Sequence, residues 1–287
     1  MDWIAASALM FCFSVLMYLF VRKSTLLKTS LQLNNLAMFG LPWFVYGAMI
    51  LINKDTISLS FLQYAIIIIS AVFFSYLGNI LSLRSMDYAP NPGYSLIISK
   101  SYVVLTSVAS VFLFGAEFTP KSALAIAIVV FSSALIVIDK PTSSQHAYKK
   151  IWLPLTLGAF FCWALLALSA KYMIELGVSV PVRLFYLTSI VSLLILGEIR
   201  LQKVRIGRLS PSQIIVLALI GIFAAGFNYF MNIGYELAPN LGYINLVNAS
   251  SISALTIFSA ILFKDELNLR KIAGVLGVTV GLFILFI

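Results

Sequence analysis

The sequence predicts an all-α integral membrane protein with ten transmembrane helices, arranged as two inverted repeats of five helices each. Of its 287 residues, 61% are hydrophobic and only 10% are charged, whereas soluble domains have about 25% charged residues. A helix needs about 20 mostly apolar residues to cross a bilayer, and the chain contains ten such runs. Because lipid leaves only helices and closed barrels as spanning structures, and these runs do not alternate, we expect helices.

A short motif that occurs twice indicates the repeat. Ala89-Pro90-Asn91-Pro92-Gly93-Tyr94 returns as Ala238-Pro239-Asn240-Leu241-Gly242-Tyr243, at an offset of 238 − 89 = 149 residues. At the same offset Asn79 matches Asn228 and Glu117 matches Glu266. An offset of half the chain is typical of a tandem duplication. We therefore divide the chain into a first repeat at 1–139, a linker at 140–150 and a second repeat at 151–287.

The ten spans follow from the apolar runs between clusters of charged residues. Gly40 and Pro42 are expected to interrupt the second span, because proline removes a helical hydrogen bond. The predicted spans are Asp2–Val21, Leu31–Ile52, Leu59–Leu83, Pro92–Phe114, Lys121–Ile138, Ile151–Tyr172, Val180–Leu201, Pro211–Tyr235, Leu241–Phe263 and Lys271–Ile287.

The positive charges predict the orientation. Five spans per repeat is an odd number, so the second repeat must enter the membrane upside down relative to the first. The loops after odd-numbered spans contain 14 of the 19 Lys and Arg residues, and the loops after even-numbered spans contain 4. By the positive-inside rule the first set is cytoplasmic and both termini lie outside. A short chain without a cleavable presequence is typical of a multi-pass protein of a prokaryotic plasma (inner) membrane.

The same composition excludes several functions. The net charge of +9 is spread over short loops, and no soluble segment is long enough to form a nucleic-acid site. His146 is the one histidine and lies in the linker, so no histidine-based metal cluster or catalytic triad is expected. The chain has no Walker-type phosphate loop. We expect neither an enzyme nor a bound cofactor.

Lys100 is the first candidate for a substrate-binding residue. It lies eight residues past Pro92, which is about 12 Å along a helix and close to the middle of a bilayer. A charge at that depth usually faces a cavity or a partner. Its repeat counterpart is Ala249, so the charge belongs to one half only. The alternative is a lysine that pairs with carbonyl groups or extends to the membrane surface.

Amides and aromatic side chains complete the candidate set. An amide without a partner is costly in lipid, so those in the spans either join helices or line a cavity. The aromatic side chains form either cavity walls or an interfacial belt. In the twin motif, Asn91 and Asn240 are expected to cap helices, and Gly93 and Gly242 to allow close packing. The candidates are Asn79, Asn228, Asn232, Asn245, Asn248, Tyr94, Tyr243 and Trp163.

These features together resemble a known family. Ten spans in two repeats, with the Ala-Pro turn before each fourth helix, are similar to the EamA type of the drug/metabolite transporter superfamily. Phe114-Gly115-Ala116-Glu117 and Phe263-Lys264-Asp265-Glu266 stand where that family has a Gly-Glu ending, and Gly274, Gly277 and Gly281 match the small-residue face of its last helix. Ser14 departs from the pattern, because the family often has a tryptophan there, as at Trp163. The resemblance implies transport of a small molecule.

We therefore predict a secondary active transporter, an exporter or exchanger of a small metabolite such as an amino acid. It would work by alternating access around a cavity near the membrane midplane, with Lys100 binding an anionic group or exchanging a proton. Expected partners are the substrate and the lipid bilayer, with protons as the candidate coupling ion, and the protein is expected to be a monomer or homodimer. The alternative is a membrane-embedded partner of a lipid flippase, or an enzyme without ATPase activity.

Overall fold

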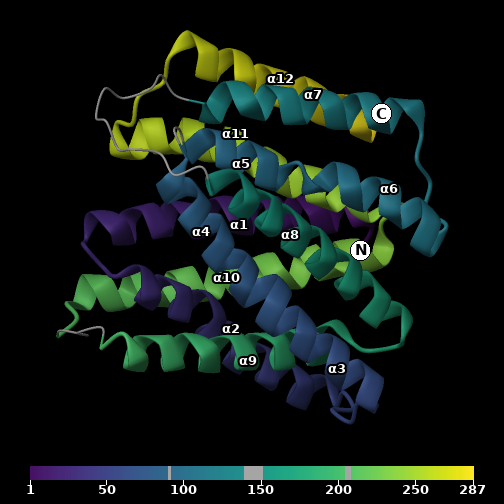
Figure 1. Ribbon diagram of the computed structural model, residues 1–287, viewed down its shortest axis with the longest axis vertical. Coiled ribbons are helices and arrows are strands. Elements are labelled where there is room, and N and C mark those ends of the chain that lie inside the picture. The colour runs from purple at the N-terminus through teal and green to yellow at the C-terminus, as the bar shows by residue number, and fades with distance from the viewer. Residues whose placement is uncertain (90–91, 139–150, 204–207) are drawn as a thin grey trace. The chain divides into compact units, whose positions relative to one another are not determined.

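The computed structural model describes residues 1–89, 92–138, 151–203 and 208–287, and within them all regular elements are helical (Figure 1). Ten helical stretches are long and apolar enough to cross a membrane, which confirms the predicted all-α membrane fold. The elements are α1 (Trp3–Leu26), α2 (Leu31–Asn53), α3 (Phe61–Ile69), η1 (Ser70–Leu77), α4 (Gly78–Tyr88), α5 (Pro92–Lys100), α6 (Tyr102–Phe114), α7 (Pro120–Val137), α8 (Trp152–Glu175), α9 (Val180–Leu201), α10 (Pro211–Leu237), α11 (Leu241–Phe263) and α12 (Leu269–Phe286).

The helix boundaries repeat at the offset found in the sequence. Helix α8 begins and ends 149 residues after α1 (152 − 3 and 175 − 26), and α12 has the same relation to α7 (269 − 120 and 286 − 137). The six residues with positive φ among those described form three pairs at this offset: Lys28 with Gly177, Lys54 with Lys203, and Gly115 with Lys264. The two halves therefore share turn conformations as well as span lengths.

Three spans differ from the prediction. The interruption expected at Gly40 and Pro42 is wrong, since α2 continues through both residues. The third span is composite: α3 passes into the π-helical segment η1 and then into α4. The fourth span changes geometry at Ser101, between α5 and α6. Pro42 is tolerated because it removes only one backbone donor, and a full break would expose many more polar groups to lipid.

The described residues form two compact units, and each unit takes residues from both halves of the sequence. Unit 1 consists of 1–72 and 169–236, and unit 2 of 73–168 and 237–287. In unit 1, the C-terminal part of α2 packs against the beginning of α9, where Ile50 and Val182 share a buried cluster. Tyr46 is completely buried and donates a hydrogen bond of 2.8 Å from its hydroxyl to the Ala225 carbonyl of α10.

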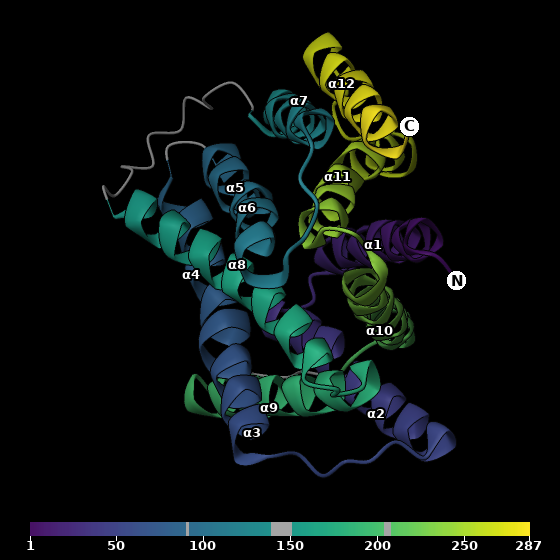
Figure 2. The same cartoon turned by 90° about the vertical axis from the view of Figure 1, so that its right-hand side faces the viewer.

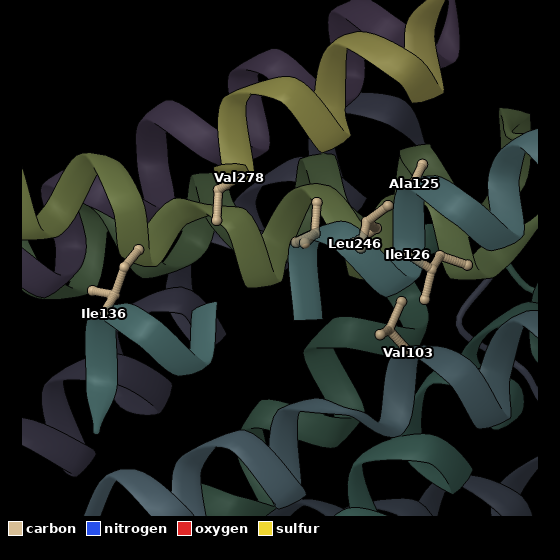
Figure 3. Packing of buried hydrophobic residues seen from close by; sticks show 7 residues of the cluster. Val103, Ala125, Ile126, Ile136, Leu246 and Val278 are labelled. Carbon is tan, nitrogen blue, oxygen red and sulfur yellow. The ribbon is translucent and has the colours of Figure 1, made fainter. Parts of the chain in front are cut away.

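Unit 2 has its core between α6, α7, α11 and α12. Figure 3 shows buried side chains from these four helices, with Val103, Leu246 and Val278 among them. Helices α7 and α12 lie side by side in Figures 1 and 2 and make the most extensive helix contact of the unit. A Cβ on Gly274 would lie 2.7 Å from the Ser132 carbonyl oxygen, and one on Gly281 would lie 2.6 Å from Val129 Cγ2. The expected small-residue face of the last helix is therefore a helix contact, typical of membrane proteins.

Large apolar side chains on the outside of the helices fit a lipid environment. Phe61 is 90% exposed, Phe112 82% and Leu51 80%. A soluble protein rarely exposes such side chains in contiguous numbers, whereas in a bilayer they face hydrocarbon. The chain is a multi-pass membrane protein.

Candidate functional site

Lys100 lies where the fourth span changes geometry. It is the last residue of α5 and is half-buried. The following turn tightens: the Val104 amide donates to the carbonyl of Ser101, three residues back, at 2.9 Å. Within the described part of the chain, the Lys100 ammonium group makes no hydrogen bond and no ion pair. A lysine in a span with free donors is a suitable group to bind an anion or to exchange a proton.

Two of the predicted amides in unit 2 also have uncommitted side chains. Asn79 is half-buried on α4, directly after the π-helical segment, and Asn248 is 7% exposed on α11. Neither side chain makes a hydrogen bond to another described residue. Trp163 on α8 is half-buried, and Tyr94 on α5 is 39% exposed. These side chains remain candidates for substrate contact.

The second copy of the twin motif joins α11 to the end of α6. As predicted, Asn240 caps α11, accepting a 2.8 Å hydrogen bond from the Gly242 amide. Its side-chain nitrogen donates to the carbonyls of Ser107 (3.1 Å) and Glu117 (2.9 Å), and the Tyr243 hydroxyl donates to Glu117 at 3.2 Å. A Cβ on Gly242 would lie 2.7 Å from Ser107 Cβ, so close packing requires glycine here. The predicted cap Asn91 lies outside the described residues.

Asn245 is committed to the same helix contact. It is fully buried, donates to Thr106 Oγ1 at 3.0 Å and accepts from the Tyr102 hydroxyl at 3.3 Å. Both ends of the amide therefore connect α11 to α6. This is the arrangement expected of an interhelical link, the first of the two interpretations open for the amides.

The remaining two candidates, Asn228 and Asn232, lie in unit 1 and form a ladder along α10. The Asn232 side-chain nitrogen donates to the Asn228 carbonyl at 2.8 Å, and that of Asn228 donates to the Ala224 carbonyl at 2.9 Å. The Asn232 oxygen accepts from Arg183 Nη1 at 2.8 Å. Arg183 on α9 is only 3% exposed, so this ladder ends at a buried positive charge.

Sequence analysis did not identify Arg183 as a candidate. It lies three residues after the start of α9, and a charge so close to a span end counts as a loop charge in the positive-inside rule. The available signal was Pro181, two residues before it, because proline favours the first helical turn and so places Arg183 inside the helix. What the sequence could not indicate is that α10 would cover the side chain.

Known proteins resemble this chain in sequence and in fold. Residues 150–287 match the EamA-like transporter family. A protein of Archaeoglobus fulgidus described as an uncharacterized transporter is 24% identical over 226 residues, which cover 77% of this chain and 76% of that protein. These two similarities support an EamA-type protein, with the family match confined to the second half of the chain. A solved structure, described only as a crystal structure of protein, superposes with a TM-score of 0.78 at 12% identity, covering 98% of this chain and 96% of its own.

The similarities indicate the general function. The family match and the relative described as a transporter support a membrane transporter in general, with a small-molecule substrate and a lipid environment. The solved structure agrees over nearly the whole chain, and at 12% identity it shows the fold alone. The ten-span prediction and the family resemblance drawn from the twin motif are confirmed.

Proposed function

We propose that this EamA-type protein is a secondary active transporter, an exporter or exchanger of a small metabolite that carries an anionic group, such as an amino acid. It has no part that could couple transport to ATP, since the sequence lacks a Walker-type loop. The proposed mechanism is alternating access around a cavity near the membrane midplane. The protein acts as a transporter and catalyses no covalent chemistry.

The observation that supports this proposal is the ammonium group of Lys100, which lies inside a span and has no hydrogen-bond or ion-pair partner among the described residues. A buried or half-buried charge is costly and is retained where it binds a ligand or moves a proton. Lys100 ends α5, and Asn79 and Asn248 offer amides that no described residue uses. We assign Lys100 to the substrate carboxylate or to an exchanged proton, and Asn79 and Asn248 to neutral hydrogen bonds. Trp163 and Tyr94 would provide apolar contacts.

The remaining predicted residues take a supporting part in this proposal. Asn245 and Tyr243 hold α11 against α6 and the segment after it, and so fix the helix on which Asn248 lies. Asn228 and Asn232 form the ladder on α10. Their contribution would be to keep the helices in register while the transporter changes conformation.

The test combines ligand-induced stabilisation with flux. We expect an amino acid or related anionic metabolite to raise the melting temperature of the purified protein, and at 100 times its dissociation constant the gain is about 2.7 kcal/mol. The same compound should enter proteoliposomes, and flux should respond to a trapped counter-substrate or to a proton gradient. Lys100→Ala and Lys100→Met should lose both responses. Lys121→Ala, which removes an exposed lysine at the start of α7, is the matched control and should keep them.

Two outcomes would contradict the proposal at different levels. Normal flux in both Lys100 variants would show that Lys100 takes no part in transport. If no anionic metabolite stabilised the wild type and none were transported, the proposed substrate class would be wrong.

A further inference from the structure

The buried guanidinium group of Arg183 has a neutral partner where an opposite charge is expected. Arg183 is 3% exposed, and removing an arginine from water is normally compensated by a carboxylate or phosphate. In residues 1–89, 92–138, 151–203 and 208–287, its guanidinium group donates to the Asn232 amide oxygen, and no carboxylate forms an ion pair with it. The positive charge is therefore not neutralised by the described chain.

The surrounding contacts hold the guanidinium group in place without using most of its donors. Asn232 accepts from Nη1 and, at its other end, donates to the Asn228 carbonyl at 2.8 Å, so the amide has one orientation. The side chain of Tyr235, itself buried, interacts electrostatically with Arg183. A guanidinium group has five N–H donors in a planar fork. Among the described residues, the Asn232 oxygen is the partner of one of these donors.

A second unused group lies one helical turn before Arg183. Ser179 is the N-cap residue of α9, but its side chain makes no capping hydrogen bond, and its Oγ is sealed from solvent without a partner. The Arg183 amide donates to the Ser179 carbonyl at 3.0 Å, so both residues belong to the first turn of α9. A buried hydroxyl without a partner is rare in folded proteins. An anion bound at this end of α9 would supply the partner that Ser179 Oγ lacks.

We propose that Arg183, Asn232 and Ser179 form a binding site for an oxyanion, a carboxylate or a phosphate group. The guanidinium fork matches two oxygens of either group, the Ser179 hydroxyl can donate to a third position, and the N-terminus of α9 adds a favourable dipole. Arg183 lies three residues from the start of α9 and Asn232 five residues from the end of α10, about 4.5 and 7.5 Å along their helices. The site is thus near one membrane surface, where either a soluble anion or a lipid headgroup can supply the oxyanion.

The site is independent of the proposed role of Lys100, because it belongs to unit 1 and Lys100 belongs to unit 2. Its test measures binding and needs no transport. Purified protein is titrated with inorganic phosphate and with acetate against sodium chloride of equal ionic strength, and its melting temperature is recorded. In a second arm, delipidated protein is titrated with phosphatidylglycerol, and native mass spectrometry counts the lipids that stay bound.

We expect Arg183→Gln to weaken binding of the effective anion about ten- to a hundredfold, as expected for loss of hydrogen bonds to a charged group. Ser179→Ala should weaken it several-fold. Arg208→Gln, which removes an exposed arginine of the same unit, should leave it unchanged. Stabilisation by phosphate or acetate identifies a soluble-anion site, whereas one phospholipid retained by the wild type but lost from Arg183→Gln identifies a headgroup site.

The apo protein gives an additional readout. If Arg183 serves a ligand, Arg183→Gln should be at least as stable as the wild type without anions, since it removes an uncompensated buried charge. A purely structural arginine would instead make the variant less stable. If Arg183→Gln fails to fold, Arg183→Lys and Ser179→Ala replace it in the test. Arg183→Lys keeps the positive charge but lacks the planar guanidinium group. Unchanged binding in both, or no anion and no lipid bound by the wild type, would overturn the proposal.

Discussion

Replacing Gly242 by alanine adds a methyl group where α11 touches α6. The new Cβ would lie 2.7 Å from Ser107 Cβ and 2.8 Å from Ser107 Cα. Backbone atoms cannot move aside as a flexible side chain can, so the two helices must separate. Overpacking of this kind costs about 1–3 kcal/mol, whereas alanine in place of a helical glycine gains up to about 1 kcal/mol from helix propensity.

Gly197 on α9 provides a matched control, because a Cβ there would meet no atom within 4 Å. Gly197→Ala keeps the propensity gain without the clash. The free energies of unfolding of the two variants should therefore differ by about 1–3 kcal/mol, with Gly242→Ala the less stable. Equilibrium unfolding in mixed detergent–SDS micelles, followed by tryptophan fluorescence, measures this difference.

A double-mutant cycle locates the effect at Ser107. Replacing Ser107 by glycine removes the Cβ and hydroxyl that meet the new methyl group, so the Gly242→Ala/Ser107→Gly pair should recover part of the loss. Residues in contact show coupling of about 0.5–3 kcal/mol. The reasoning is refuted if Gly242→Ala is as stable as Gly197→Ala, or if the two positions show no coupling.

Two further substitutions test single buried contacts by the same unfolding measurement. Tyr46→Phe removes the 2.8 Å hydrogen bond to the Ala225 carbonyl and should lower the free energy of unfolding by about 1–3 kcal/mol, because that buried acceptor loses its donor. The control, Tyr229→Phe, removes a hydroxyl without a partner among the described residues and should be neutral. Equal effects of the two substitutions would contradict the assignment of this hydrogen bond. Asn245→Ala breaks links to Tyr102 and Thr106 and should cost about 1–3 kcal/mol. Asn248→Ala should cost less, since no described residue bonds its amide; the reverse order would contradict the distinction between the two amides.

The sequence predicts the spans well because lipid imposes a simple rule on them. Apolar length and charged boundaries are sufficient to place α2, α9 and α11 within one or two residues. Local irregularity is not encoded in hydropathy. The π-helical segment at Ser70–Leu77 and the change of geometry at Ser101 depend on which side chains the neighbouring helices supply, and Pro42 is accommodated within α2.

The candidate site was only partly accessible to the same reasoning. Composition identifies costly groups inside spans, and so it selects Lys100 and the amides. It cannot say which amides have partners: Asn245 is saturated by α6, whereas Asn248, three residues later, makes no hydrogen bond within the described chain. That difference depends on which face of α11 meets α6. Arg183 was missed for a related reason, since its burial depends on a helix 49 residues away at Asn232.

The contacts between equivalent helices bear on how the repeats are oriented. Counterpart spans pack directly against each other as α2 with α9, α6 with α11 and α7 with α12. In each pair, residues later in one helix contact residues earlier in the other, as Gly40 of α2 lies near Ser192 of α9 and Gly47 near Phe185. Gly274 and Gly281 of α12 meet Ile136 and then Val129 of α7, and the two helices are antiparallel. Equivalent helices that cross the membrane in opposite directions are what an inverted repeat requires.

Lys54 and Lys203 offer a direct test of the inversion. They are exposed counterparts 149 residues apart, each in the left-handed conformation just after a span. An inverted repeat places them on opposite sides, and the charge distribution predicts Lys54 outside. With Cys12 and Cys162 replaced by alanine, a membrane-impermeant maleimide applied to intact cells should label Lys54→Cys and spare Lys203→Cys, and permeabilised cells should label both. Labelling of both in intact cells would refute the inversion, whereas labelling of Lys203→Cys alone would preserve it and reverse the predicted orientation.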